Sequence, residues 1–200
     1  MANQYKIKII FLGCLFGLFL QSCCLTDTCN RALTNINQEE LMLIENGDLI
    51  LRKGTGIVSS MIVDYLNDST GFSHIGILVK ENDSVYVIHS LGREFSDTEG
   101  VQQCSLADFT SELNAEEIVI VRRICSDNSD IANMAKEYLN RNIPFDRAFN
   151  FNDTTAFSCL ELPYRILERL NDHHEGLTNF KIFTNPSLFE VVVDKRRAML

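Results

Sequence analysis

The sequence contains few prolines and glycines, the residues that dominate fibrous and low-complexity chains. It has three prolines and ten glycines among 200 residues, and no segment repeats along it. These scarcities exclude collagen-like and low-complexity chains, because both need a strongly biased composition. The chain is 46% hydrophobic and 22% charged, which excludes a disordered chain and predicts one domain with a buried core.

Positive charge is scarce as well. Lysine and arginine number 18 against 27 acidic residues, which gives a net charge of −9 and no basic stripe. We expect no nucleic-acid partner, because phosphate contacts need clustered positive charge. The chain also lacks a Cys-x-x-Cys pair, so we predict no zinc knuckle, and neither a metal nor a cofactor.

The first residues are typical of a secretory signal. Two lysines stand in Met1 to Lys8, and an apolar run of twelve residues follows from Ile9 to Leu20. As a helix this run reaches about 18 Å, less than the roughly 30 Å hydrocarbon core of a bilayer. The next residues, Leu20-Gln21-Ser22-Cys23, resemble the lipobox of bacterial lipoproteins, in which the cysteine is acylated.

This resemblance implies a signal peptide over residues 1–22, a lipidated Cys23, a polar tether over 23–37 and a domain over 38–200. Two or more acyl chains hold a protein firmly on a membrane. The implied location is the bacterial cell envelope, with the membrane bound through the lipid anchor. An ordinary cleaved signal and an uncleaved anchor remain the alternatives.

Cysteine usage fits such a compartment. Of seven cysteines, Cys14 leaves with the signal and Cys23 takes lipid, so five remain: Cys24, Cys29, Cys104, Cys125 and Cys159. An envelope protein is free to form disulfides, but an odd number leaves at least one thiol free or paired between molecules.

Hydrophobic periodicity predicts leading strands and two closing helices. We expect strands at 47–52, 74–79, 84–90, 117–124 and 188–193, and helices at 38–45, 56–66, 106–112, 127–140 and 158–170. This order favours an α+β fold with a small antiparallel sheet.

Two histidines are predicted to meet in the central hairpin. A four-residue loop from Lys80 to Asp83 pairs Val79 with Ser84 and sets His74 directly opposite His89. Directly opposed side chains share a sheet face, with Cβ atoms about 4.5–5.5 Å apart. A structural role for each histidine is the alternative.

Cys159 is expected at the start of the last helix. Free backbone N–H groups and the helix dipole favour the thiolate there and depress the pKa of the thiol. A buried cysteine in the core is the alternative.

Short segments add a resemblance. Residues 73–77, Ser-His-Ile-Gly-Ile, are similar to the SHVGI strand of permuted papain-like hydrolases, the YiiX/YaeF-type relatives of NlpC-type cysteine peptidases. Residues 157–162 resemble the family's Y-C-S-E-L segment, with Phe157 where tyrosine and Leu160 where serine are common. Segments 46–50 and 144–149 agree in order and spacing, and the cysteine follows the histidine, which is the permuted order.

The resemblance implies a circularly permuted papain-like fold, whose helices include that of the nucleophile. It implies Cys159 as nucleophile, His74 as base and His89 as the third residue, which orients the base. Glu161 is interpreted as structural, fixing the first turn of the helix.

The leading interpretation is a cysteine hydrolase that cleaves an amide bond in a peptide, a cell-wall peptide or a lipid or other small amide. A second keeps the fold but acts on acyl groups, as an acyltransferase or a lipid ester or thioester hydrolase. A third is a non-catalytic binding module of the envelope. A deep apolar groove beside Cys159 favours acyl substrates, and a polar groove with charged clamps favours peptides.

Overall fold

The computed structural model describes residues 35–124, 127–170 and 179–196. The predicted signal peptide, Cys23 and most of the tether lie outside these ranges, as do Cys24, Cys29 and Cys125. The last predicted tether residue, Asn37, caps α1 (Gln38–Leu43) by accepting a hydrogen bond of 2.9 Å from the Glu40 N–H. Within the described ranges, no helix is both long and apolar enough to cross a membrane.

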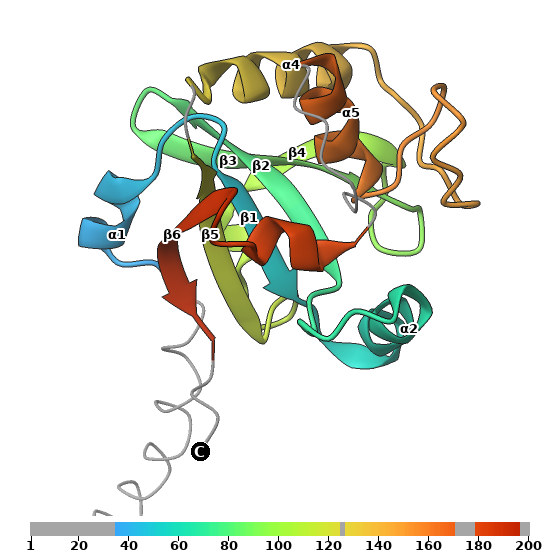
Figure 1. Ribbon diagram of the computed structural model, residues 1–200, viewed down its shortest axis with the longest axis horizontal. Helices are drawn as coiled ribbons and strands as arrows, with labels where there is room; N and C mark the ends of the chain where they lie inside the picture. The colour runs from blue at the N-terminus through green and yellow to red at the C-terminus, as the bar shows by residue number, and fades with distance from the viewer. Residues whose placement is uncertain (1–34, 125–126, 171–178, 197–200) are drawn as a thin grey trace, which may run out of the picture. The chain divides into compact units, whose positions relative to one another are not determined.

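Six strands of the described chain form one antiparallel sheet in the order β4-β3-β2-β1-β5-β6 (Figure 1). Their bounds are β1 (Leu49–Lys53), β2 (His74–Glu81), β3 (Ser84–Leu91), β4 (Gly100–Ser105), β5 (Glu117–Arg123) and β6 (Phe189–Lys195). The α+β class and the antiparallel sheet are confirmed.

The sequence analysis misses β4 for a physical reason. Within this strand only Val101 joins the apolar core as a fully buried side chain, and Gln103 is exposed. The strand therefore has no apolar alternation to reveal it. Pairing with β3 rather than burial of its own side chains accounts for its conformation.

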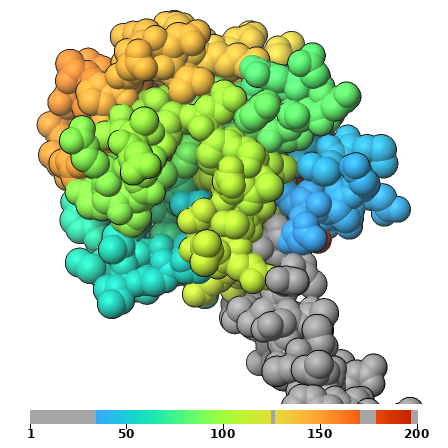
Figure 2. Space-filling view, turned by 180° about the vertical axis from the view of Figure 1, so that it is seen from behind, coloured from blue at the N-terminus to red at the C-terminus, as the bar shows by residue number. Residues whose placement is uncertain are grey.

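Each face of the sheet carries its own core, because side chains alternate along a strand. Ile75, Ile77 and Val79 of β2 pack against α4 (Ser129–Asn140), α5 (Glu161–Arg169) and the 3₁₀ helix η1 (Phe180–Thr184). Leu78 lies on the opposite face, with α3 (Leu106–Phe109). Figure 1 shows α4 and α5 side by side over the first face, and Figure 2 shows α1 in blue beside the yellow-green chain around α3.

The predicted register of the central hairpin is wrong by two residues. The loop is two residues long, Asn82-Asp83, with Asn82 at a φ of 54°, and it pairs Glu81 with Ser84. A slip of one residue turns every side chain to the other face, whereas a slip of two preserves the face. His74 and His89 therefore still share a face, but they lie diagonally rather than directly opposite.

Helix α2 (Gly56–Leu66) joins the end of β1 to the beginning of β2, with the predicted bounds. None of its residues is fully buried, and only Ile62 and Leu66 pack on the core. Ile57, Met61 and Tyr65 are 80%, 62% and 72% exposed, respectively. The helix thus presents an apolar stripe to solvent, at the end of the sheet where β1 ends (Figure 1).

Candidate active site

The two predicted histidines form a hydrogen-bonded pair. His74 begins β2, His89 lies near the end of β3, and both are almost fully buried on the α3 face. His74 Nε2 and His89 Nδ1 are 2.8 Å apart. The ring planes meet at 73°, with centroids 5.1 Å apart. The predicted meeting of the two imidazoles is present, in a diagonal arrangement.

Gly76 leaves room for this diagonal contact. The last pair of β2 and β3 is Ile77↔Ile88, so the next residue of β2, Gly76, lies opposite His89. A Cβ atom at Gly76 would come within 2.3 Å of Val87 Cγ1 and 3.4 Å of His89 Cβ. The missing side chain therefore lets the two strands and the imidazole of His89 approach closely.

Two residues that the sequence analysis did not single out cover the pair. The ring of Phe109 in α3 stacks on His74, with centroids 5.5 Å apart, and meets His89 edge-on at 5.4 Å. Arg52 of β1 lies directly opposite His74, and its guanidinium carbon is 4.5 Å from the centre of the Phe109 ring. The sequence contains only a weak indication of Arg52: side chains alternate along β1, so Arg52 shares a face with the buried Ile50.

The strands β2 and β3 part before they reach the histidines. Their pairing with each other ends at Ile77↔Ile88. Beyond that point β2 continues along β1 as far as His74, and β3 continues along β4 as far as Leu91. At this end of the sheet the two strands are joined by the side chains of His74 and His89 rather than by paired backbone.

The segment before α5 is bonded to the end of β3. Ser90 Oγ donates a hydrogen bond of 2.6 Å to the carbonyl oxygen of Phe157. The backbone N–H of Ile75 acts on the thiol of Cys159 and favours its charged form. Cys159 packs in the core on the α4 and α5 face, and among the described residues no hydrogen bond joins its thiol to His74.

A reciprocal cap starts the turn that carries Cys159. The Ser158 N–H donates to Glu161 Oε2 at 2.7 Å, and the Glu161 N–H donates to Ser158 Oγ at 3.4 Å. This is the capping-box arrangement. The α-helix itself begins at Glu161 rather than at the predicted Ser158. Glu161 fixes the first turn, as the sequence analysis interprets it.

The thiol of Cys159 is neutral in this enclosed site. Burial raises its pKa to about 12, although Arg52 and the backbone N–H groups of Leu160, Ile75 and Cys159 itself pull the pKa down. The predicted depression of this pKa is therefore wrong for the described state. The free-energy cost of burying a thiolate in apolar surroundings is larger than the stabilisation that the start of the helix gives it.

Both imidazoles are held neutral too. Burial, the charge of Arg52 and the neighbouring His89 lower the pKa of His74 well below its usual value. Burial and Arg52 lower the pKa of His89 to about 3. With Nε2 of His74 bonded to His89, its Nδ1 has no hydrogen-bond partner among the described residues. Nδ1 is the ring nitrogen of His74 that takes no part in the bond between the two histidines.

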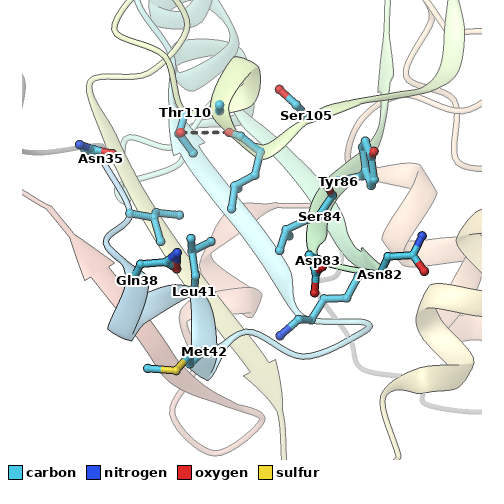
Figure 3. Close-up of a pocket in the computed structure, with 15 residues that line it drawn as sticks. Asn35, Gln38, Leu41, Met42, Asn82, Asp83, Ser84, Tyr86, Ser105 and Thr110 are labelled. Atoms are coloured by element: carbon cyan, nitrogen blue, oxygen red, sulfur yellow. Dashed lines mark hydrogen bonds between the residues drawn. The ribbon is translucent and has the colours of Figure 1, made fainter.

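Two grooves flank these elements. One of about 770 Å³ lies between α1, α3 and the hairpin loop, and Figure 3 shows Gln38, Leu41 and Met42 across it from Asn82, Asp83 and Ser84. Its lining residue on β2, Lys80, is six residues from His74, about 20 Å along an extended strand. This groove is therefore separate from the candidate active site.

The second groove lies at the histidine end of the sheet. It measures about 560 Å³ between α2 and the end of β1, and charged Lys53, Asp64 and Glu116 line it. Gly54, also in its wall, donates its N–H to Ser73 Oγ at 2.9 Å, and Ser73 directly precedes His74. A polar groove with both charge signs thus adjoins the strand ends that hold Arg52 and His74.

A second thiol lies on the α3 face of the sheet, where the charge of Arg52 acts on it. Cys104 is a free thiol on β4, and burial raises its pKa to about 11. In the described parts of the chain, no group of three or more histidine, cysteine or acidic side chains is arranged to hold a metal ion.

Comparison with known proteins shows which family this chain belongs to. The profile described as "Permuted papain-like amidase enzyme, YaeF/YiiX" matches residues 43–188, which include His74, His89 and Cys159. Among solved structures, the chain resembles the metalloprotein yiiX from Escherichia coli, with a TM-score of 0.51 and 23% identity. That match covers 62% of this chain and 65% of the other, so the chain spans less than two thirds of that protein. A search of curated proteins gave no significant match. With the profile covering most of the domain, the chain belongs to the permuted papain-like amidase family of enzymes.

Proposed function

We propose that this enzyme hydrolyses an amide bond with Cys159 as nucleophile and His74 as base. One observation supports this most: the 2.8 Å bond between the two imidazoles, at the end of β2 where the Ile75 N–H acts on the Cys159 thiol. The bond directs Nε2 of His74 at His89 and leaves Nδ1 for the thiol. Family membership supports amide chemistry in general, and these contacts support the assignment of residues.

The reaction follows from the neutral pair. As Cys159 Sγ attacks the amide carbon, its proton passes to Nδ1 of His74, and the C–N bond breaks as His74 returns that proton to the departing nitrogen. A thioester remains on Cys159. Water then attacks the thioester as His74 takes one of its protons, and the C–S bond breaks as His74 returns that proton to the sulfur and the acid is released. Backbone N–H groups near Cys159 stabilise the oxyanion in both steps.

His89 orients the base in this scheme. For Nδ1 of His74 to accept a proton, Nε2 must carry the hydrogen and donate it to His89 Nδ1. His89 then carries its own hydrogen on Nε2, which is buried without a partner in the described structure. The pair therefore fixes one tautomer of His74, which is the role of a third triad member.

The groove beside the histidine end favours a peptide substrate. Its walls offer the cation of Lys53 and the carboxylates of Asp64 and Glu116. These side chains can bind charged termini or polar side chains, whereas an acyl chain would gain nothing from them. A peptide, such as a cell-wall peptide, is the substrate we infer.

One observation favours the second candidate, an enzyme for acyl substrates. The exposed stripe of Ile57, Met61 and Tyr65 lies on α2, which borders the same groove. Tyr65 also contacts Phe149, with ring centroids 5.9 Å apart, so the apolar surface continues toward the segment before Cys159. Lipid amides, esters or thioesters would use such a surface.

The proposed reaction uses the side chains of Cys159, His74 and His89. The solved relative is titled a metalloprotein. The described residues of this chain offer no cluster of three suitable ligands, so they do not fit a resident metal at the candidate site.

The test compares two substrate sets on purified enzyme: cell-wall and other peptides, and the same peptides carrying an N-acyl chain. We expect amine release from peptides, loss of activity by at least 10²-fold in Cys159→Ser and His74→Ala, and a covalent adduct on Cys159 of the wild type. Ser111→Ala, in the loop between α3 and β5, is the matched control and should keep full activity. Activity that survives Cys159→Ser would contradict the assignment, and activity on acylated peptides alone would favour the second candidate.

A further inference from the structure

Apolar side chains gather on the exposed side of α2. Of the ten large apolar residues that the described chain exposes, four lie on this one short helix: Ile57, Val58, Met61 and Tyr65. A fifth, Leu113, is 85% exposed, and its carbonyl oxygen accepts a hydrogen bond of 2.6 Å from Thr55 Oγ1 at the start of α2. These five residues form the α2 patch. Contiguous exposed apolar surface marks a site that binds a protein or a membrane.

The apolar residues of α2 cover one continuous side of the helix. Ile57, Met61 and Tyr65 recur every four residues, so they share one face. Ile62 and Leu66, on the adjoining side, pack on the core. The helix is therefore attached to the domain along one edge and presents its apolar face outward.

This surface carries almost no charge. Helix α2 contains one charged residue, Asp64, and no lysine or arginine. Lys53, at the end of β1, pairs with Glu116 and Glu117 at 3.3 and 3.7 Å. The whole chain has a net charge of −9. The α2 patch can therefore bind a partner through burial of apolar surface, whereas anionic lipids would repel the protein.

The chain enters the domain at the end of the sheet that bears α2. Glu40 of α1 pairs with Lys195 of β6 at 2.6 Å. The strand register sets Lys195 level with Ile118 of β5, and Ile118 level with Arg52 of β1. Helix α2 begins a few residues after Arg52, at the same end of the sheet (Figure 1). The segment before α1 and the α2 patch thus lie toward one end of the domain.

The predicted lipid on Cys23 makes a bilayer the partner within reach. Asn35, the first described residue, is twelve residues beyond Cys23, and twelve residues span at most about 40 Å. A domain held this closely meets the membrane at a high effective concentration. Weak apolar contacts are sufficient for docking under that condition.

We propose that the α2 patch docks on the surface of a lipid bilayer, with α2 in the interface and along the membrane plane. Its eleven residues reach about 16 Å, too short to span the roughly 30 Å hydrocarbon core. Docking places the bilayer at the end of the sheet where His74 begins β2, because α2 joins β1 to β2 there. The inference goes beyond the amidase activity and does not depend on the role of Cys159.

The test uses a tryptophan at the patch, because the sequence contains none and a single one reports its own surroundings. Tyr65→Trp is compared with Met42→Trp, since Tyr65 and Met42 are 72% and 73% exposed and Met42 lies on α1, in the wall of the groove that is separate from the candidate active site. The protein, as its bacterial host processes it, is mixed with phosphatidylcholine vesicles with or without bromine on the acyl chains.

We expect the emission of Tyr65→Trp to shift to the blue, and brominated chains to quench it at least about twofold. Met42→Trp should keep its emission. Because burial of apolar surface drives the docking, the quenching should be the same from about 0.05 to about 1 M salt, and anionic lipid should not strengthen it.

A second substitution tests whether the α2 patch itself is responsible. Met61→Gln, added to Tyr65→Trp, should lower the quenching by at least about half, because it replaces apolar surface that enters the bilayer. Val191→Gln is the matched control, since Val191 is 55% exposed on β6, and it should leave the quenching unchanged. These side chains are exposed, and near-UV circular dichroism checks that each variant is folded.

Four outcomes would overturn the inference. The first is quenching of Tyr65→Trp no stronger than that of Met42→Trp. The second is quenching that needs anionic lipid and disappears in salt. The third is a blue shift without vesicles and a doubled mass in analytical ultracentrifugation, which means that a second copy of the chain covers the patch. The fourth is unchanged quenching in Met61→Gln with a raised KM for acylated peptides in solution, which makes the patch a substrate subsite.

The amidase role of Cys159 fails separately, through hydrolysis that persists in Cys159→Ser. None of the fluorescence measurements depends on turnover, so the two failures are distinguishable.

Discussion

Single residues show most clearly where sequence reasoning succeeds and where it stops. His74 and His89 were placed on one face although the predicted loop was too long, because an error of two residues preserves the face of a strand. Arg52 was not predicted, because its meaning depends on the residue across from it and on the ring of Phe109. The pKa of Cys159 was predicted in the wrong direction, because local sequence gives the helix start but not the depth of burial.

The depressed pKa of His89 predicts a dependence of stability on pH. Its pKa is about 3 in the fold and about 6.5 in the unfolded chain, so between these values only the unfolded chain binds the proton. Stability contributed by the neutral histidine is complete above pH 6.5 and is lost as the pH falls toward 3. The loss is at most about 1.4 kcal/mol per pH unit for each histidine.

We therefore expect the free energy of unfolding, measured by urea titration, to fall more steeply in the wild type than in His89→Gln between pH 6.5 and 4. His74 retains its low pKa in the variant, because burial and Arg52 are its larger causes. Equal slopes for the two proteins would show that His89 is not buried as a neutral group.

At the scale of elements, hydrophobic periodicity predicted the amphipathic helices. It missed the elements whose conformation depends on pairing with a neighbouring strand or is too short to show a period. Helices α2 and α4 appear close to their predicted bounds, because their apolar spacing is clear. Strand β4 and helix η1 were missed, since the first is formed by pairing with β3 and the second is a single short turn. The end of the β2–β3 pairing at Ile77↔Ile88 was also beyond sequence reasoning, because both strands continue past it.

The close approach of β2 and β3 predicts the effect of a methyl group at Gly76. In Gly76→Ala the new Cβ would lie 2.3 Å from Val87 Cγ1, a stiff β-branched side chain. We expect a loss of about 1–3 kcal/mol in the free energy of unfolding, which is the range for overpacked cores. Activity should fall as well, because the imidazole of His89 must move.

A double-mutant cycle tests whether the clash of the new Cβ with Val87 causes this loss of stability. Val87→Ala removes the clashing methyl, so Gly76→Ala should cost clearly less in that background than in the wild type. The measurement is urea unfolding of the four proteins. An equal cost in both backgrounds would place the strain elsewhere, such as against the carbonyl of Ile88.

At the scale of the whole molecule, the sequence divides into a stretch that resembles a lipoprotein signal and a region that matches the amidase family. The family match begins at residue 43 and ends at 188, so the stretch that resembles a lipoprotein signal lies before it. A lipid anchor would confine the enzyme to a membrane surface and raise its local concentration for substrates held there. Cell-wall peptides and lipid-linked amides are both substrates of that kind.

The last prediction concerns this anchor. The charged start, the apolar run and Leu20-Gln21-Ser22-Cys23 predict cleavage before Cys23 and acylation of that residue. In a bacterial host the mature protein should partition into detergent, since two or more acyl chains bind membranes firmly. Cys23→Ala should leave the protein unprocessed or free in the aqueous phase, whereas Cys24→Ala, its matched neighbour, should be processed and lipidated normally. The intact mass of the mature protein decides: a first residue other than Cys23, or a Cys23 without lipid, would contradict the prediction.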